Sequence, residues 1–277
     1  MEWQKLKNLI ILILLVVNGF LLVLVWSRRQ ESARYERSAL EQTVQVLQRS
    51  GIEVDLSAAA PADGLAPMSV ERELDREEAL ARALLGKGAV QAENRGGGLY
   101  LYQGSNGELS VRAGGELSAK MADNPNQLVS GDLERHASGL LKRMGVDVER
   151  IGVTKEDEWT RVQFRQVWNG APVFSCEVEV VYYYELLYSV QGTLLTAQAG
   201  TAEAGQALTL PTALMRFSEE IAATGDVCTA IRSMEPGYRG TVQSLSGGVR
   251  LSPVWLVTTD TARYYLDCVT GALTRIE

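Results

Sequence analysis

The sequence predicts an α+β fold in which a single N-terminal transmembrane helix is followed by tandem units, each made of one helix packed on an antiparallel sheet. Two observations lead to this prediction. Residues 8–26 form an apolar run without a charged residue. Toward the C-terminus, a helical pattern followed by strand patterns occurs twice, with a weaker third occurrence at 69–112. Because a lone amphipathic element cannot bury its apolar face, each helix is expected to cover its own sheet.

These patterns divide the chain into six segments. The segments are a short cytoplasmic N-terminus (1–7), a transmembrane helix (8–26), a juxtamembrane helix and linker (27–68), an N-terminal α+β region (69–126), a first helix-on-sheet unit (127–200) and a second one (201–277).

The apolar run is long enough to cross a bilayer, since a helix of this length spans roughly 28 Å. A cleaved signal peptide would have a shorter apolar run and a small-residue cleavage site, so we interpret the run as an uncleaved anchor. Asn18 and Gly19 lie near its middle. An amide in hydrocarbon needs a hydrogen-bond partner and glycine allows close backbone approach, so both are candidates for contact with a partner transmembrane helix. Hydrogen bonding of Asn18 within its own helix remains the alternative.

The orientation of this anchor does not follow from the flanking charges. Lys5 and Lys7 precede the run, and Arg28 and Arg29 follow it. The positive-inside rule leans toward a cytoplasmic C-terminal part on this count, but long domains translocate largely regardless of flanking charge.

Composition argues against several classes of function. The net charge of −7 argues against binding to nucleic acid. His136 is the single histidine, and the three cysteines leave no complete set of disulfides. Glu177 and Glu179 lie on one strand face, where a solvated surface explains them better than a catalytic pair. No catalytic constellation is present in the sequence, so we predict a protein that is not an enzyme and that has no cofactor or metal.

In the first half of the chain, a helical pattern after Ser27 is expected to end at Gly51, followed by a short strand at 52–56 and a loop at 57–67. Ser69 is predicted to cap a helix that runs to Leu85. A strand at 99–102 leads into a hairpin turn at Asn106-Gly107.

In the second half, Asp132 begins a helix that ends at Gly145. Asn169-Gly170 predicts a hairpin turn, and the next strand alternates, with Cys176 facing inward. Pro211 opens a helix through Thr224, and strands are expected at 227–232 and 238–245.

Two motifs carry a resemblance to a known module. The segment from Val162 to Phe174 and its counterpart from Pro253 to Val257, each followed by a tyrosine-rich strand, resemble PepSY-type or thermolysin-propeptide-type modules. Together with the N-terminus and its apolar run, the layout resembles the YycI regulatory proteins, most closely over 1–26 and 159–277.

This resemblance implies a single-pass membrane protein of a Gram-positive cell with a cytoplasmic N-terminus and an extracellular C-terminal part. It also implies that the protein, together with a YycH-like regulatory protein, binds and modulates a sensor histidine kinase that controls cell-wall metabolism. Two alternatives stay open. One is a propeptide-like inhibitor or chaperone of an extracellular protease, and the other is a module that binds a ligand of the cell envelope.

Overall fold

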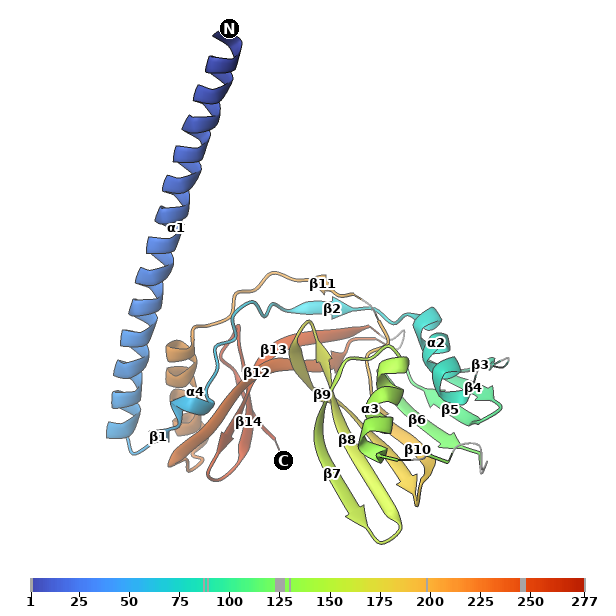
Figure 1. Ribbon diagram of the computed structural model, residues 1–277. Coiled ribbons are helices and arrows are strands. Elements are labelled where there is room, and N and C mark those ends of the chain that lie inside the picture. Colours follow the sequence, from blue (N-terminus) through green and yellow to red (C-terminus); the bar gives the residue numbers. More distant parts are fainter. Residues whose placement is uncertain are drawn as a thin grey trace.

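The computed structural model describes residues 2–86, 88, 90–122, 128–129, 131–197, 199–244 and 248–276. Within the first helix, the described side chains are those of residues 3, 7–8, 11, 13–22 and 34–49. This helix, α1 (Glu2–Arg49), extends away from the remainder of the chain, which forms two sheet-rich halves beside each other (Figure 1). The other helices are α2 (Leu74–Leu85), α3 (Leu133–Arg143), α4 (Leu210–Thr224) and the short 3-10 helix η1 (Leu56–Ala58).

The strands of the described residues join into one 15-stranded sheet with the central order β11-β2-β13-β12-β9-β10-β6-β5-β4-β3. Their bounds are β1 (Glu53–Val54), β2 (Met68–Val70), β3 (Gln91–Gly96), β4 (Leu99–Gly104), β5 (Gly107–Val111), β6 (Glu116–Met121), β7 (Val148–Glu156), β8 (Trp159–Trp168), β9 (Ala171–Tyr183), β10 (Leu186–Thr193), β11 (Thr201–Ala202), β12 (Ala230–Val242), β13 (Val249–Thr259), β14 (Arg263–Asp267) and β15 (Leu273–Ile276).

The first lobe, which we define as α2, α3 and strands β3–β10, has its own apolar core. Both helices contribute to one cluster with the inward side chains of β4–β6 and β8–β10. This core also encloses an ion pair. Glu77 of α2 is buried and binds Arg72 at 2.5 Å, while the hydroxyls of Tyr102 and Thr196 donate to the same carboxylate at 3.2 Å. The pair therefore ties α2 both to the sheet and to the segment after β10.

The second lobe consists of α4, strands β12–β15, β1, β2, β11 and the C-terminal end of α1. Its core joins segments that are far apart in the sequence, because Leu47 of α1 packs in the same cluster as Leu214 and Phe217 of α4. β1 pairs in parallel with β12, and β2 pairs with β13. The segment after α1 is therefore built into a sheet made mainly of C-terminal strands.

The two lobes meet where β9 approaches β12. The ladder between these strands has a single register pair, Tyr238 with Val173. Next to this pair lies Gly237, where a Cβ atom would come within 2.5 Å of the carbonyl oxygen of Pro172. Only glycine allows this close crossing of the two backbones.

The prediction of a membrane-spanning helix is wrong. No stretch of helix among the described residues combines the length and the apolar content that crossing a bilayer requires. α1 instead runs through residues 8–26 without interruption and continues as a polar helix to Arg49, so the apolar run is one part of a longer element. The predicted continuation of this helix up to Gly51 is confirmed. The side chains of Trp26, the last residue of the run, and of Arg28 and Arg29, which follow it, lie outside the described set.

The predicted α+β class is also wrong, because the structure is mostly β-sheet. Several strands were missed because they carry no alternation of buried and exposed residues. β3 is exposed along its whole length, and β7 contains no buried residue. β6 does alternate, with Leu117, Ala119 and Met121 buried, and its signal was overlooked. In addition, β12 is one continuous strand where two strands were expected; Leu245, at the end of the second, lies outside the described residues.

At the level of single elements, the local signals were more reliable. Asp132 caps α3, Pro211 lies in the first turn of α4, and Gly225 ends α4 in the left-handed conformation. Hairpins turn at the two predicted Asn-Gly pairs, between β4 and β5 and between β8 and β9. Ser69, however, lies in β2, where it pairs with β11 and β13, so α2 begins only at Leu74.

Candidate interaction surfaces

The N-terminal half of α1 exposes large apolar side chains all around the helix. Their exposed fractions lie between 47% and 71%. These residues are Ile11, Ile13, Leu14, Leu15, Val16, Val17, Phe20, Leu21 and Leu22. Apolar surface of this extent is uncommon on a protein that has no interaction partner.

The two residues predicted to contact a partner helix lie within this surface. Asn18 and Gly19 are both exposed, and a Cβ atom placed on Gly19 would meet no atom within 4 Å. The described part of the chain therefore leaves their face of the helix open. Whether a partner occupies that face stays a prediction.

The C-terminal end of α1 is fixed by packing. Leu47 is 1% exposed and lies in the core of the second lobe, with Leu40 at the edge of the same cluster. Its neighbour in that core is α4, and Figure 1 shows the two helices side by side at the outer edge of the lobe. One end of α1 is therefore held by the globular part while the other end projects from it.

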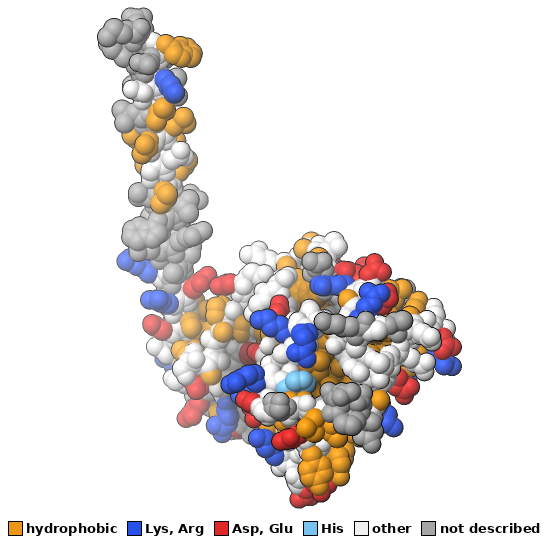
Figure 2. Space-filling view, turned by 45° about the vertical axis from the view of Figure 1, so that its right-hand side comes forward, with side chains coloured by type: hydrophobic (Ala, Val, Ile, Leu, Met, Phe, Trp, Pro, Cys, Tyr) orange, Lys and Arg blue, Asp and Glu red, His pale blue; other side chains and the backbone are white. Residues whose placement is uncertain are grey.

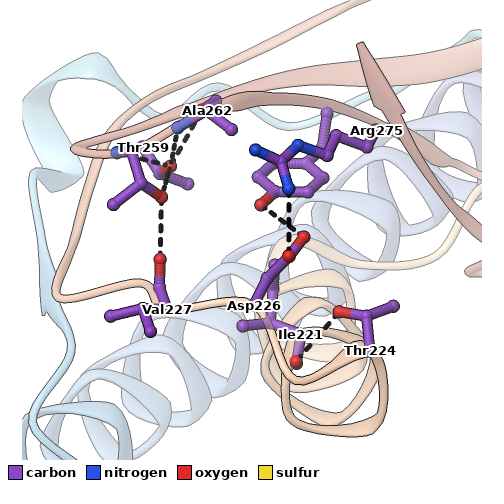
Figure 3. Close-up of polar contacts among 9 residues, drawn as sticks. Ile221, Thr224, Asp226, Val227, Thr259, Ala262 and Arg275 are labelled. Carbon is purple, nitrogen blue, oxygen red and sulfur yellow. Dashed lines mark hydrogen bonds and ion pairs between the residues drawn. The ribbon is translucent and has the colours of Figure 1, made fainter. Parts of the chain in front are cut away.

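The end of α4 is in turn fixed to the C-terminal strands (Figure 3). The carboxylate of Asp226, just after α4, accepts hydrogen bonds from the Tyr264 hydroxyl at 2.9 Å and from Arg275 at 3.0 Å. The Thr261 hydroxyl donates to the carbonyl of Val227 at 2.7 Å. Phe217 of α4 meets Tyr264 edge-on, with ring centroids 5.7 Å apart. A continuous set of contacts thus leads from α1 through α4 to β14 and β15.

A cavity of about 870 Å³ opens beside the crossing of β9 and β12. Its walls come from β6, β9, β10 and β12 and from the turn between β5 and β6. On β6 and β10, Ser118 pairs with Gln191, and both point away from the apolar core. The hydroxyl of Ser175 accepts a hydrogen bond from the backbone N–H of Gly240 at 2.8 Å across the cavity wall.

The lining of this cavity is nearly neutral and mixed, with glycines and aliphatic side chains beside a few polar groups. Ser118, Gln191 and Thr193 provide hydroxyl and amide groups, whereas Arg112 and Glu116 lie 3.6 Å apart and offset each other's charge. The cavity volume lies in the range of small-molecule sites. Its side chains are suited to an uncharged ligand that combines apolar surface with a few hydrogen-bonding groups.

The thiol of Cys176 lies at the cavity wall, facing inward as predicted, and is 2% exposed. Burial raises its pKa to about 12, so the nucleophilic thiolate is not formed at neutral pH. Cys176, Cys228 and Cys268 are all free thiols.

The other residues considered as catalytic candidates, His136, Glu177 and Glu179, do not come together in one site. His136 is half-buried between α3 and β9, where its Nδ1 lies 2.8 Å from the Tyr182 hydroxyl. Burial, and secondarily Arg143, lowers its pKa. Glu177 binds Arg165 at 3.0 Å on the outer face of β9, and Glu179 accepts from Gln163 at 3.3 Å. Across the described ranges, no group of three or more His, Cys, Asp or Glu side chains is placed to hold a metal ion.

Comparisons with known proteins address the fold. No protein-family model and no curated protein matches the chain. The crystal structure of an uncharacterized protein from Eubacterium rectale ATCC 33656 is similar to it, with a TM-score of 0.50, 13% identity and coverage of 82% of this chain and 90% of that chain. The Bacillus megaterium YpeB C-terminal domain is similar with a TM-score of 0.36, 14% identity and coverage of 75% of this chain and 99% of that chain. At this identity, the likeness to the Eubacterium rectale protein shows a shared fold and no activity.

Proposed function

We propose that the protein is a regulator that works by binding other proteins and that α1 is its main contact element. The observation that carries this proposal is the exposed apolar surface between residues 11 and 22 on a helix whose other end is fixed in a folded lobe. Surface of this kind gains free energy when a partner covers it. Because α1 packs on α4, a partner that displaces the free end also acts on the second lobe.

We further propose a sensor histidine kinase as the partner, together with a YycH-like regulatory protein. This identity rests on the resemblance of the sequence to YycI proteins over 1–26 and 159–277 and to PepSY-type modules. Asn18 and Gly19 are the proposed contact residues, since an amide next to a glycine suits close packing of two helices.

The experiment compares Asn18→Leu with wild type at equal protein level and measures co-purification of the kinase and output of its target promoters. We expect both readouts to change in the variant. Gln45→Leu makes the same kind of change on an exposed position near the fixed end of α1 and serves as the matched control. Wild-type behaviour of Asn18→Leu in both readouts would show that α1 does not recognise the kinase through this residue.

On the same resemblance, we assign the globular part to the outside of the cell. The test introduces Ser50→Cys, an exposed position after α1, into a Cys228→Ser background and treats intact cells with a membrane-impermeant thiol reagent. Labelling of intact cells is the expected result. Labelling only after lysis would contradict this assignment.

A second function, binding of a cell-envelope ligand, is favoured by the cavity of about 870 Å³ between the lobes. Its neutral lining of aliphatic, hydroxyl and amide groups suits the uncharged glycan part of peptidoglycan, whose N-acetylated sugars carry methyl, amide and hydroxyl groups. We expect a neutral N-acetylglucosamine oligosaccharide to raise the melting temperature of the wild type but not of Ser118→Trp, whose ring would fill the cavity. Ser189→Trp, on β10 outside the lining, is the control. An equal rise in the melting temperature of the wild type, Ser118→Trp and Ser189→Trp would show that the ligand binds outside the cavity.

A further inference from the structure

A cluster of aromatic side chains covers the turns between β7 and β8 and between β9 and β10, which lie side by side. We define the acid-aromatic tip as Trp159, Tyr183, Tyr184 and Tyr188 together with Glu156, Asp157, Glu158 and Glu185. Figure 1 shows the turn between β7 and β8 at the end of the molecule opposite the N-terminus of α1. In Figure 2, hydrophobic side chains gather with acidic ones at the lower end of the globular part.

The rings of this tip pack on one another and not on the core. Trp159 lies 4.8 Å from Tyr183 and 5.0 Å from Tyr188, measured between ring centroids, and Tyr183 lies 4.8 Å from Tyr184. Tyr184 is 57% exposed and Tyr188 is 44% exposed, whereas the preceding Tyr182 is fully buried. Mutual packing fixes the rings while leaving much of their surface in water. Rigid, exposed tyrosine and tryptophan are the residues enriched where proteins bind each other.

One carboxylate is built into this aromatic surface. Glu158 accepts hydrogen bonds from the Tyr183 hydroxyl, at 3.0 Å, and from the Tyr184 hydroxyl. These bonds lower the pKa of Glu158 and raise that of Tyr184 to about 12, so the carboxylate stays ionised between two neutral phenols. The backbone supports the arrangement, because Tyr184 donates its N–H to the Glu158 carbonyl at 2.6 Å.

The charges around the rings are mainly negative. Glu156, Asp157, Glu158 and Glu185 are all exposed. The nearby cations are already engaged: Arg161 binds Glu156 at 3.3 Å and lies 4.0 Å from Glu179, and Lys155 lies 3.8 Å from Glu134 of α3. A cation that approaches the tip therefore meets ring faces, a fixed carboxylate and a negative field. Guanidinium and ammonium groups gain from all three.

We propose that the acid-aromatic tip is a docking surface for a basic segment of a partner protein, one that presents arginine or lysine side chains to the rings around Glu158. Charge complementarity selects this occupant, because the acidic rim repels anionic peptides and anionic lipid surfaces. The inference does not rest on the proposed function, since α1 contributes no residue to the tip. It gives the protein a second contact surface, at the end opposite the free end of α1.

The test uses the full chain and two fluorescein-labelled peptides of equal length, one of alternating arginine and alanine and one of alternating glutamate and alanine. Binding is followed by fluorescence anisotropy. We expect the arginine peptide to bind and the glutamate peptide not to bind. Tyr184→Asn removes one ring but keeps a residue that tolerates the backbone conformation there, where φ is 52°. Loss of the contact between the Tyr184 ring and an arginine side chain should weaken binding of the arginine peptide by roughly tenfold.

Glu158→Gln tests the charge, and we expect it to weaken binding by roughly fivefold without a change in melting temperature. Tyr35→Ala and Glu219→Gln change exposed residues of the same types on α1 and α4 and are the matched controls. The proposal would be overturned if the tip variants and the control variants bound the arginine peptide equally well. It would also be overturned if the glutamate peptide bound the wild type as well as the arginine peptide does. So would the absence of binding by the arginine peptide to the wild type.

Discussion

The two lobes cover their sheets with helices in the same way but hold those helices by different means. In the first lobe, Arg72 and Glu77 form a buried ion pair at the start of α2. Their hydrogen bonds with the Val111 carbonyl and the Tyr102 hydroxyl fasten α2 to the sheet. In the second lobe, α4 is held by apolar contacts with Leu47 and by the hydrogen bonds of Asp226. A buried ion pair requires every partner to be in place, whereas an apolar contact weakens gradually as atoms are removed. The first lobe is therefore the more rigidly specified, and the second is the one suited to transmit movement from α1.

The largest effect is expected for Glu77→Ala in the first lobe. The change leaves the Arg72 guanidinium, whose side chain is 7% exposed, without its carboxylate partner. Loss of one member of a buried ion pair costs about 3–5 kcal/mol. Urea unfolding followed by circular dichroism measures this loss.

The double variant Arg72→Met with Glu77→Leu is the control for this prediction, because it removes both charges and should recover a large part of the stability. A loss below about 1 kcal/mol in Glu77→Ala would show that the pair is not what distinguishes the first lobe.

Leu47→Ala is expected to weaken the second lobe by about 2–4 kcal/mol, since the side chain is 1% exposed in the core between α1 and α4. Hydrogen exchange should become faster in α4 (210–224) and stay unchanged in α3 (133–143). Val46→Ala, at a 44% exposed position one residue earlier, is the control. Equal acceleration in both helices would mean that the lobes do not unfold separately.

A smaller effect is expected for Tyr264→Phe, which removes the hydroxyl that donates to Asp226 at 2.9 Å and keeps the ring against Phe217. One such hydrogen bond contributes about 0.5–1.5 kcal/mol, or somewhat more when the acceptor is charged. Thermal unfolding measures the change, with the exposed Tyr35→Phe for comparison. A loss equal to that of Leu47→Ala would make the hydrogen bonds around Asp226, rather than apolar packing, the main attachment of α4.

The smallest effect expected is on how the stability of the first lobe depends on pH. The folded protein lowers the pKa of His136, mainly by burial, so the unfolded chain binds the extra proton more readily below about pH 6.5. This contribution to stability is complete above pH 6.5 and is lost as the pH falls. Melting temperatures between pH 8 and 5.5 should therefore fall less for His136→Gln than for the wild type. Parallel curves would contradict the prediction.

The sequence predicted those parts of the fold that have local signals. Asp132, Pro211 and Gly225 marked the ends of helices because capping depends on a few neighbouring residues. The pairings of β2 with β13 and of β1 with β12 have no local signal, since they depend on contacts between distant parts of the chain. The same is true of the cavity beside the crossing of β9 and β12, which exists only once both lobes are assembled.

The candidate site residues were predicted unevenly. Asn18 and Gly19 could be picked out because they interrupt an apolar run, and the structure leaves both exposed. The acid-aromatic tip was not recognised. Its tyrosines were treated as part of a regular strand, but Tyr184 has a φ of 52° and turns the chain at the end of β9. The Glu-Asp-Glu run at 156–158 next to Trp159 was the available signal, because a turn rich in acids keeps an adjoining aromatic ring near the surface, where such rings favour binding.

The pairing of β2 with β13 also bears on how the chain folds as it leaves the ribosome. All elements of the first lobe are synthesised before α4 and the strands β12–β15 appear. The first lobe is therefore able to condense early, while α1, β1 and β2 wait for partners that emerge last. During this interval Leu47 and the apolar residues of α1 are uncovered together, and such nascent chains are prone to aggregate. Because residues 11–22 stay exposed in the complete fold and only the end around Leu47 becomes covered, we expect a chaperone that recognises exposed apolar helices to bind ribosome-attached chains that end before residue 210 more tightly than those that extend past β13.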